Sequence, residues 1–178
     1  MATQESRDII QKMYVGYYGR PGDEAGVEFW ATQLETSNGD LSAIVDAFGT
    51  SAEYTALSDG KSSTELVNLI FNALFNRDAE GTADDAATGL GFYVGQLDSG
   101  AITAATVAQN VIDGVQGDDV TAVANKLDVA NHFTAAVVSG NKTYGANEID
   151  EGQAVINGVT ADAATVDTGK ADADSKIG

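Results

Sequence analysis

The chain of 178 residues contains no cysteine, a single proline and a single histidine. The lack of cysteine excludes a disulfide framework, thiol catalysis and thiolate metal sites. Because His132 is the only histidine, one chain can hold neither a two-histidine metal site nor a catalytic pair of histidines. A GxSxG motif and a glycine-rich phosphate loop are also missing. We therefore expect a protein that is not an enzyme and that requires no cofactor.

Basic residues and long apolar runs are scarce as well. Nine Lys and Arg residues oppose 27 Asp and Glu residues, and the net charge of -18 argues against partners such as nucleic acid or anionic lipid. No stretch approaches the roughly 18 to 20 apolar residues that span a bilayer. The first residues, "MATQESRDII", lack the basic and then apolar order of a secretory signal. If the protein is exported, we expect a route without a cleaved N-terminal signal.

The apolar residues that are present recur at helical spacing. One stripe near the start consists of Ile10, Met13, Tyr14, Tyr17 and Tyr18. Pro21 predicts that this helix stops near Gly19, and Asp23 or Gly22 can cap a second helix. Shorter helices are expected after Asp40 and after residues 50–51, and the stripe restarts at residue 66. The fold class predicted from these patterns is all-α.

Two parts of the chain repeat the same pattern. Tyr14 and Phe71, Tyr18 and Phe75, and Arg20 and Arg77 are each separated by 57 positions. Three further pairs share a separation of 63 positions: Phe29 and Phe92, Trp30 and Tyr93, and Leu34 and Leu97. This similarity predicts two tandem helical units, a first unit (residues 1–60) and a second unit (residues 61–140) with a longer loop.

The second unit is expected to end in a long helix, and a C-terminal extension follows it. The long helix begins at Asp118 or Asp119 as its cap, with an apolar face that starts at Val120, and His132 lies near Asp128 as a partly exposed packing residue. Residues 141–178 are predicted to form one or two short helices and then a polar tail. We expect this tail to fray unless a partner holds it.

The paired arginines and aromatic residues allow two interpretations. Arg20 and Arg77 can pair with a nearby acid (Asp23 or Glu24, and Asp78 or Glu80) and with helix-end carbonyls, or they can bind an anionic ligand such as a sugar acid. Trp30 and Tyr93 can belong to the core, or they can stack on a sugar ring. The structural interpretation is favoured for both pairs. For Trp30 and Tyr93 the reason is that aromatic residues at helical spacing are usually buried.

Calcium is the one metal that the sequence suggests. The loop "NRDAEGTADDAATG" gathers the carboxylates of Asp78, Glu80, Asp84 and Asp85, and hard cations bind several such oxygens. The order of these residues does not match the EF-hand loop. A diffuse role for divalent cations, which would bridge the acidic surface to neighbouring molecules or to lipopolysaccharide, is the stronger expectation.

Residues 9–57 resemble a bacterial domain of unknown function that occurs in surface-layer proteins and in calcium-binding repeat-in-toxin adhesins. This domain is itself distantly similar to the phycobilisome linker domain. The residues that carry the resemblance are Tyr14, Tyr18, Gly19, Arg20, Gly26, Trp30, Leu34, Ser51, Glu53 and Tyr54. Residues 66–98 resemble it more loosely, with Asn76 and Tyr93 at the positions of a glycine and a tryptophan. The calcium-binding "GGxGxDxL" repeats of such proteins are absent from this chain.

This resemblance implies a non-enzymatic, all-α module of a protein exported by the one-step type I route. We expect an extracellular structural protein that self-associates into a surface layer or filament, or attaches to lipopolysaccharide or another surface polysaccharide. Two alternatives stay open. One is an intracellular scaffold or linker module, and the other is a carbohydrate-binding adhesin module without assembly.

Overall fold

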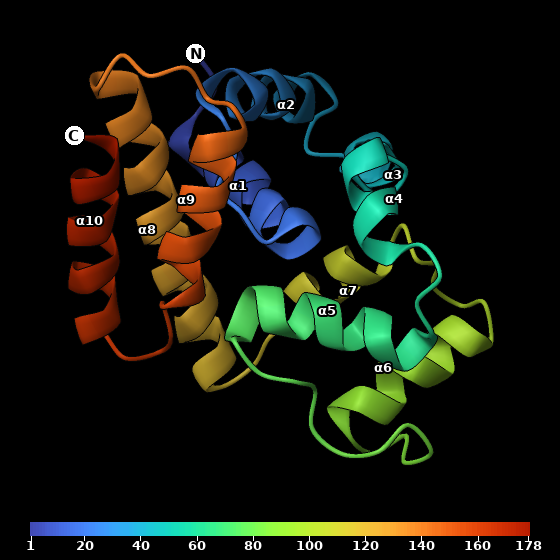
Figure 1. The fold of residues 1–178 in the computed structure, drawn as a ribbon. Helices are drawn as coiled ribbons and strands as arrows, with labels where there is room; N and C mark the ends of the chain where they lie inside the picture. The colour runs from blue at the N-terminus through green and yellow to red at the C-terminus, as the bar shows by residue number, and fades with distance from the viewer.

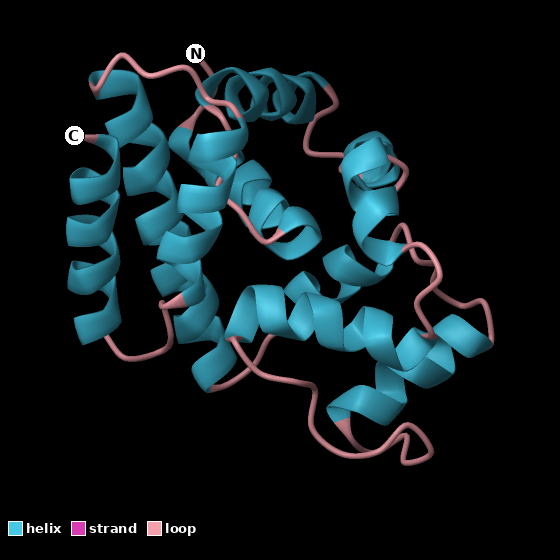
Figure 2. Cartoon of the chain, viewed as in Figure 1, coloured by secondary structure: helices cyan, strands magenta, loops and turns pink.

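The computed structural model describes all 178 residues and consists of ten α-helices without a β-strand (Figures 1 and 2). The prediction of an all-α fold is therefore confirmed. The helices are α1 (Gln4–Tyr18), α2 (Glu24–Thr36), α3 (Ser42–Gly49), α4 (Ala52–Ser58), α5 (Ser63–Phe75), α6 (Gly89–Asp98), α7 (Val107–Asp113), α8 (Asp118–Ser139), α9 (Ala146–Asn157) and α10 (Ala164–Ile177).

Local sequence signals set most of the early helix ends. α1 ends because Gly19 adopts the left-handed conformation, with φ at 63°, and its N–H bonds to Val15. The Asp23 carboxylate then accepts a 2.8 Å hydrogen bond from the Gly26 N–H and caps α2. Ser62 and Glu65 form a reciprocal capping box at the start of α5. The stripe predicted for residues 10–18 is buried as expected.

The buried apolar residues form one continuous core. A single cluster of 35 residues extends from Ile10 in α1 to Ile177 in α10. α1 lies inside the molecule and packs against α2, α5, α7 and α8, while α8, α9 and α10 stand side by side along one flank (Figure 1). The expected boundaries near residues 60 and 140 therefore do not separate independent cores. The tandem-unit division itself stays a prediction.

The start and the buried face of α8 differ from the expectation. Gly117, with φ at 57°, precedes the helix. Asp118 and Asp119 lie in its first turn, where their negative charges interact favourably with the helix dipole, but neither side chain caps the helix. Val120 is 49% exposed, so the apolar face does not begin there. The buried face instead includes Lys126, a residue that a hydrophobic pattern does not reveal.

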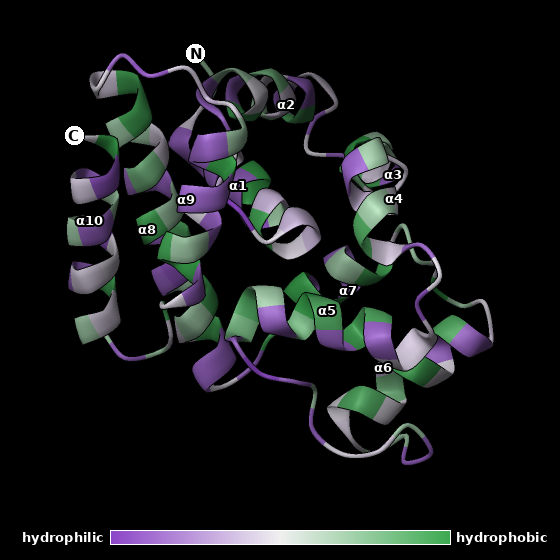
Figure 3. Cartoon of the chain, in the orientation of Figure 1, coloured by the Kyte–Doolittle hydropathy of each residue, from purple (hydrophilic) through white to green (hydrophobic).

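The C-terminal tail is ordered, which corrects the expectation that it frays. Residues 164–177 form α10, which packs against α8 and α9. The helix has few strongly hydrophobic residues (Figure 3), but Gly169 and Ala173 let it approach α8 closely. A Cβ atom added at Gly169 would lie 3.0 Å from a Val129 methyl carbon. Close backbone packing thus replaces the large apolar side chains that the tail lacks.

None of the ten helices combines the length and the apolar character that a membrane-spanning helix requires.

Candidate functional site

The first arginine of the repeated pattern is the centre of a buried ion pair. Arg20 is only 7% exposed, and its Nε and Nη2 donate to the two carboxylate oxygens of Glu53 at 2.6 and 2.8 Å. Its guanidinium also lies over the rings of Tyr14, Tyr18 and Tyr144 at 5.1 to 5.8 Å. Burial alone would lower the pKa of Arg20, but the Glu53 carboxylate outweighs it and raises that pKa. We call this cluster the Arg20 centre.

The second arginine forms a similar but more open cluster, the Arg77 centre. Nη2 of Arg77 donates to both carboxylate oxygens of Asp119 at 2.9 and 3.0 Å. The guanidinium lies over the rings of Phe71 and Phe75 at 5.7 and 5.6 Å. The Arg77 side chain is 38% exposed, and the pair contributes little by itself because water screens it.

The two centres have matching positions in the fold. Gly19 and Asn76, which end α1 and α5, are both left-handed, with φ at 63° and 58°. Each arginine comes next in the chain, and each pairs with the second residue of a later helix, α4 or α8. Both also bond a nearby carbonyl, through Nη1 to Pro21 and Asp78 respectively.

The ion-pair partners expected from nearby sequence are mostly wrong. Arg20 pairs with Glu53 and not with Asp23 or Glu24, because Asp23 caps α2 and Glu24 pairs with Arg7. Arg77 pairs with Asp119 and only loosely with Glu80, whose Oε1 lies 3.8 Å from Nη1. The partners follow from the packing of helices distant in sequence.

The two centres have aromatic residues at three corresponding positions, but only the first centre has one at a fourth position, Phe48. In the first unit the Phe48 ring lies 5.0, 5.2 and 5.7 Å from the rings of Tyr14, Tyr18 and Trp30, centroid to centroid. The residue 63 positions later is Val111. There, the corresponding rings of Phe71, Phe75 and Tyr93 line a pocket of about 190 Å³, together with Val111 and Arg77. We call it the ring pocket.

The tryptophan and its counterpart are not open platforms for a sugar. Trp30 is half-buried and packs on Phe48, while the half-buried Tyr93 packs on Phe71 and donates its hydroxyl to the Asn110 carbonyl at 3.3 Å. Leu34 is buried and Leu97 packs against the core. The exposed aromatic residues are their neighbours, Phe29 at 55% and Phe92 at 50%.

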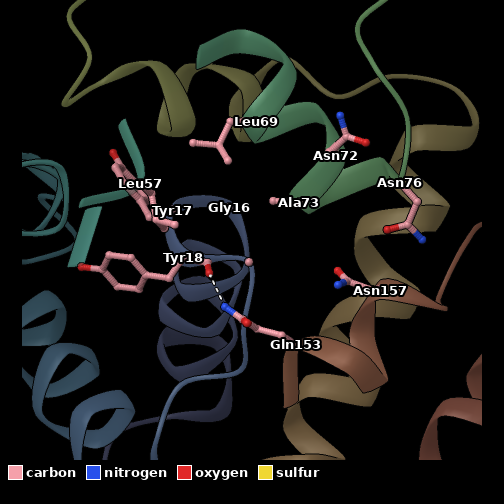
Figure 4. A pocket seen from close by; sticks show the side chains of 11 residues that line it. Gly16, Tyr17, Tyr18, Leu57, Leu69, Asn72, Ala73, Asn76, Gln153 and Asn157 are labelled. Atoms are coloured by element: carbon pink, nitrogen blue, oxygen red, sulfur yellow. Dashed lines mark hydrogen bonds between the residues drawn. The ribbon is translucent and has the colours of Figure 1, made fainter. Parts of the chain in front are cut away.

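A cleft of about 450 Å³ lies beside the two centres (Figure 4). It lies where α1, α4, α5 and α9 meet. No charged side chain lines it. Four carboxamide side chains do, namely those of Asn72, Asn76, Gln153 and Asn157, and we call it the amide cleft. Leu57 and Leu69 lie on the opposite side of the cleft from Asn157, and Gln153 donates to the Tyr18 carbonyl at 3.4 Å. Sequence reasoning missed this cleft because residues 72 and 153 meet only in the folded chain.

A buried lysine stands next to the amide cleft. Lys126 is fully buried, and its Nζ donates to the Ala73 carbonyl at 2.7 Å and to Asn76 Oδ1 at 2.6 Å. No carboxylate pairs with it, and burial lowers the pKa of its ammonium group to about 8. It joins α8 to the end of α5.

Lys126 should make the protein more stable as the pH rises from about 8 towards 10. The folded chain loses this proton near pH 8, whereas the unfolded chain keeps it up to the ordinary lysine pKa of 10.5. Because the unfolded state then binds more protons, its formation becomes less favourable with rising pH. We expect the free energy of unfolding to increase by about 1–2 kcal/mol in urea titrations from pH 8 to about 9.5.

The Lys126→Met variant should lack this rise, and equal pH slopes in both proteins would contradict the assignment. Above pH 10 the trend reverses. Burial raises the pKa of Tyr14, Tyr17 and Tyr54 above the ordinary value of 10.0, so the unfolded chain releases those protons first.

The acidic loop does not bring its carboxylates together. Asp78 Oδ1 accepts from Asn72 Nδ2 at 2.6 Å, Asp85 Oδ1 accepts from the Ala87 N–H at 3.1 Å, and Glu80 lies near Arg77. No group of three or more acidic or histidine side chains that could hold a metal is found in the structure. Calcium binding by Asp78, Glu80, Asp84 and Asp85 stays a prediction.

His132 lies beside a different acid from the one expected. Its Nε2 is 2.8 Å from Asp174 Oδ1 in α10, while Asp128 pairs with Lys170. The side chain is partly exposed, as predicted. It links α8 to α10, so the histidine belongs to the packing of the C-terminal helices.

Comparison with known proteins adds no relative: no family model, curated protein or solved structure matches this chain. The resemblance to the surface-layer domain stays a prediction. What the protein does must be inferred from its own contacts.

Proposed function

We propose that this protein is a non-enzymatic structural module that assembles with copies of itself into a layer or filament outside the cell. The observation that carries the proposal is the pair of matched arginine centres. Both arginines are engaged in ion pairs with acids of the same chain, so the most distinctive residues of the repeat hold helices together. Neither centre leaves an unpaired arginine for a reaction or an anionic ligand.

The exposed surface supports assembly. Phe29 and Phe92 occupy corresponding positions on α2 and α6, which lie at opposite ends of the molecule in Figure 1. Like units that present like surfaces can stack head to tail, and an open contact of that kind propagates into a polymer. The net charge of -18 opposes such stacking, so assembly should need screening or bridging cations.

Attachment to a surface polysaccharide is the second part of the proposal, and the amide cleft favours it. Carboxamides both donate and accept hydrogen bonds, which suits the hydroxyl and amide groups of sugars. Asn76 is already bonded to Val159 and Lys126, and the Asn72 amide nitrogen to Asp78, so Gln153 and Asn157 would provide most of the contacts. The cleft lies beside Tyr17 and Tyr18, but their rings are turned into the core. Recognition would therefore depend on hydrogen bonds more than on stacking.

Electron microscopy and sedimentation of the purified protein test this function. We expect ordered assemblies with millimolar calcium, dispersal by a chelator, and co-sedimentation with purified surface polysaccharide. Sodium chloride at matched ionic strength separates charge screening from bridging by calcium. Monomers in every condition, or a protein recovered only from inside the cell, would contradict the proposal and favour the scaffold alternative.

A further inference from the structure

We propose that the ring pocket of one copy receives the Phe29 ring of the next copy. The inference rests on the proposed self-assembly and names the contact that would carry it. The occupant is a second copy of this chain, and the contact is directional because the ring and the pocket lie on different parts of the molecule. A contact of this type links copies head to tail and does not close on itself.

The first unit shows how such a pocket is filled. Phe48 provides a ring that packs edge-on to Tyr14 and Trp30 and stacks on Tyr18, at centroid distances of 5.0 to 5.7 Å. These distances are favourable for aromatic pairs. In the second unit Val111 has the position of Phe48, the Phe71 ring packs directly on the rings of Phe75 and Tyr93, and these residues border the ring pocket. The chain thus has a central phenylalanine in one aromatic cluster and an open pocket beside the other.

The size and lining of the ring pocket suit an aromatic ring. The ring pocket measures about 190 Å³, and an apolar cavity of about 150 Å³ is large enough to bind benzene. Phe71, Phe75, Tyr93, Val111 and Val115 supply apolar walls. Arg77 and Asp119 line the same pocket as an ion pair, and Glu80, which is 83% exposed, lies at its rim 3.8 Å from Arg77 Nη1. An uncharged guest can therefore bind without separating the Arg77–Asp119 pair.

Phe29 has the properties of the guest. Its side chain is 55% exposed on α2, where only the Trp30 ring stacks against it, edge-on at 4.9 Å. α2 lies at the end of the molecule opposite α6, whose Tyr93 lines the pocket (Figure 1). Phe92 is similarly exposed, but it is on α6 beside the pocket, and its insertion would pair two copies symmetrically instead of extending a chain.

Three variants test the contact under the conditions in which the wild-type protein assembles. Phe29→Ala removes the guest and should weaken association roughly ten- to a hundredfold by sedimentation. Val111→Phe fills the pocket from within and should weaken it similarly. Val138→Ala is the control, because it truncates an apolar side chain of similar exposure (54%) on α8 that does not line the ring pocket, and it should assemble like the wild type.

Mixing the two defective variants gives the decisive result. Phe29→Ala keeps an open pocket and Val111→Phe keeps the guest ring, so an equal mixture should form heterodimers and stop there. Unimpaired polymers of Phe29→Ala, loss of assembly in Val138→Ala, or a mixture that stays monomeric would each overturn the proposal. Thermal melts establish that the variants fold, and Val111→Leu serves as a partial filler if Val111→Phe does not.

The same experiments separate this contact from the wider function. If the wild-type protein never assembles, the proposed function fails and the contact fails with it. If the wild type assembles and Phe29→Ala assembles equally well, self-assembly stands and only the ring-in-pocket contact is rejected.

Discussion

Replacing Phe48 with alanine should lower the free energy of unfolding by about 3–5 kcal/mol. The side chain is 1% exposed, and its ring contacts the rings of Tyr14, Tyr17, Tyr18 and Trp30. The substitution removes the transfer free energy of the ring and leaves a cavity whose aromatic walls cannot collapse freely. Urea denaturation followed by circular dichroism measures the change.

Val111→Ala is the matched control for Phe48→Ala. It truncates the corresponding residue of the second unit, which already borders an open pocket, and should cost only about 1–2 kcal/mol. Equal losses from the two truncations would show that the Phe48 cluster is not the better-packed version of the pair.

Arg20→Ala should destabilise the protein by about 2–4 kcal/mol, the second large effect that we expect. Removing one partner of a fully buried ion pair costs about 3–5 kcal/mol, but Glu53 is 38% exposed and can regain water, which reduces the loss. The variant also loses the packing of the guanidinium against three tyrosine rings. Denaturation at neutral pH and moderate salt provides the measurement.

Arg77→Ala provides the comparison, since the same residue type has the same position in the second unit. Its side chain is 38% exposed, and we expect a loss of about 1 kcal/mol or less. Arg20→Lys should recover less than half of the lost stability because an ammonium group cannot form the bidentate contact. If Arg20→Ala and Arg77→Ala prove equally harmful, burial is not what distinguishes the two centres.

The sequence predicted the features of the fold that depend on neighbouring residues. The end of α1 follows from the backbone preference of Gly19 for the left-handed conformation. The start of α2 follows from a hydrogen bond between the Asp23 side chain and the N–H of Gly26, three residues later. The buried stripe of α1 follows from its spacing. The correspondence of Arg20 with Arg77 was visible in the chain, and both residues do hold helix ends.

The contacts that join distant segments could not be read in the same way. Glu53 and Asp119 are 33 and 42 residues from their arginines, and acids are so common in this chain that no pattern selects them. α10 is held by small residues, the Lys170–Asp128 ion pair and the His132–Asp174 hydrogen bond, which hydrophobic periodicity does not detect. The ring pocket and the amide cleft lie between helices. Their lining residues come from segments distant in sequence, so no local pattern identifies them.

The position of α1 inside the bundle affects how the chain is made. Its apolar stripe is completed by α8, which begins at residue 118, so α1 stays partly uncovered until α8 has been synthesised. Productive folding must then wait for contacts between remote parts of the chain. Until α8 has formed, the apolar face of α1 is open to other chains, so this is the stage at which the polypeptide is most exposed to aggregation.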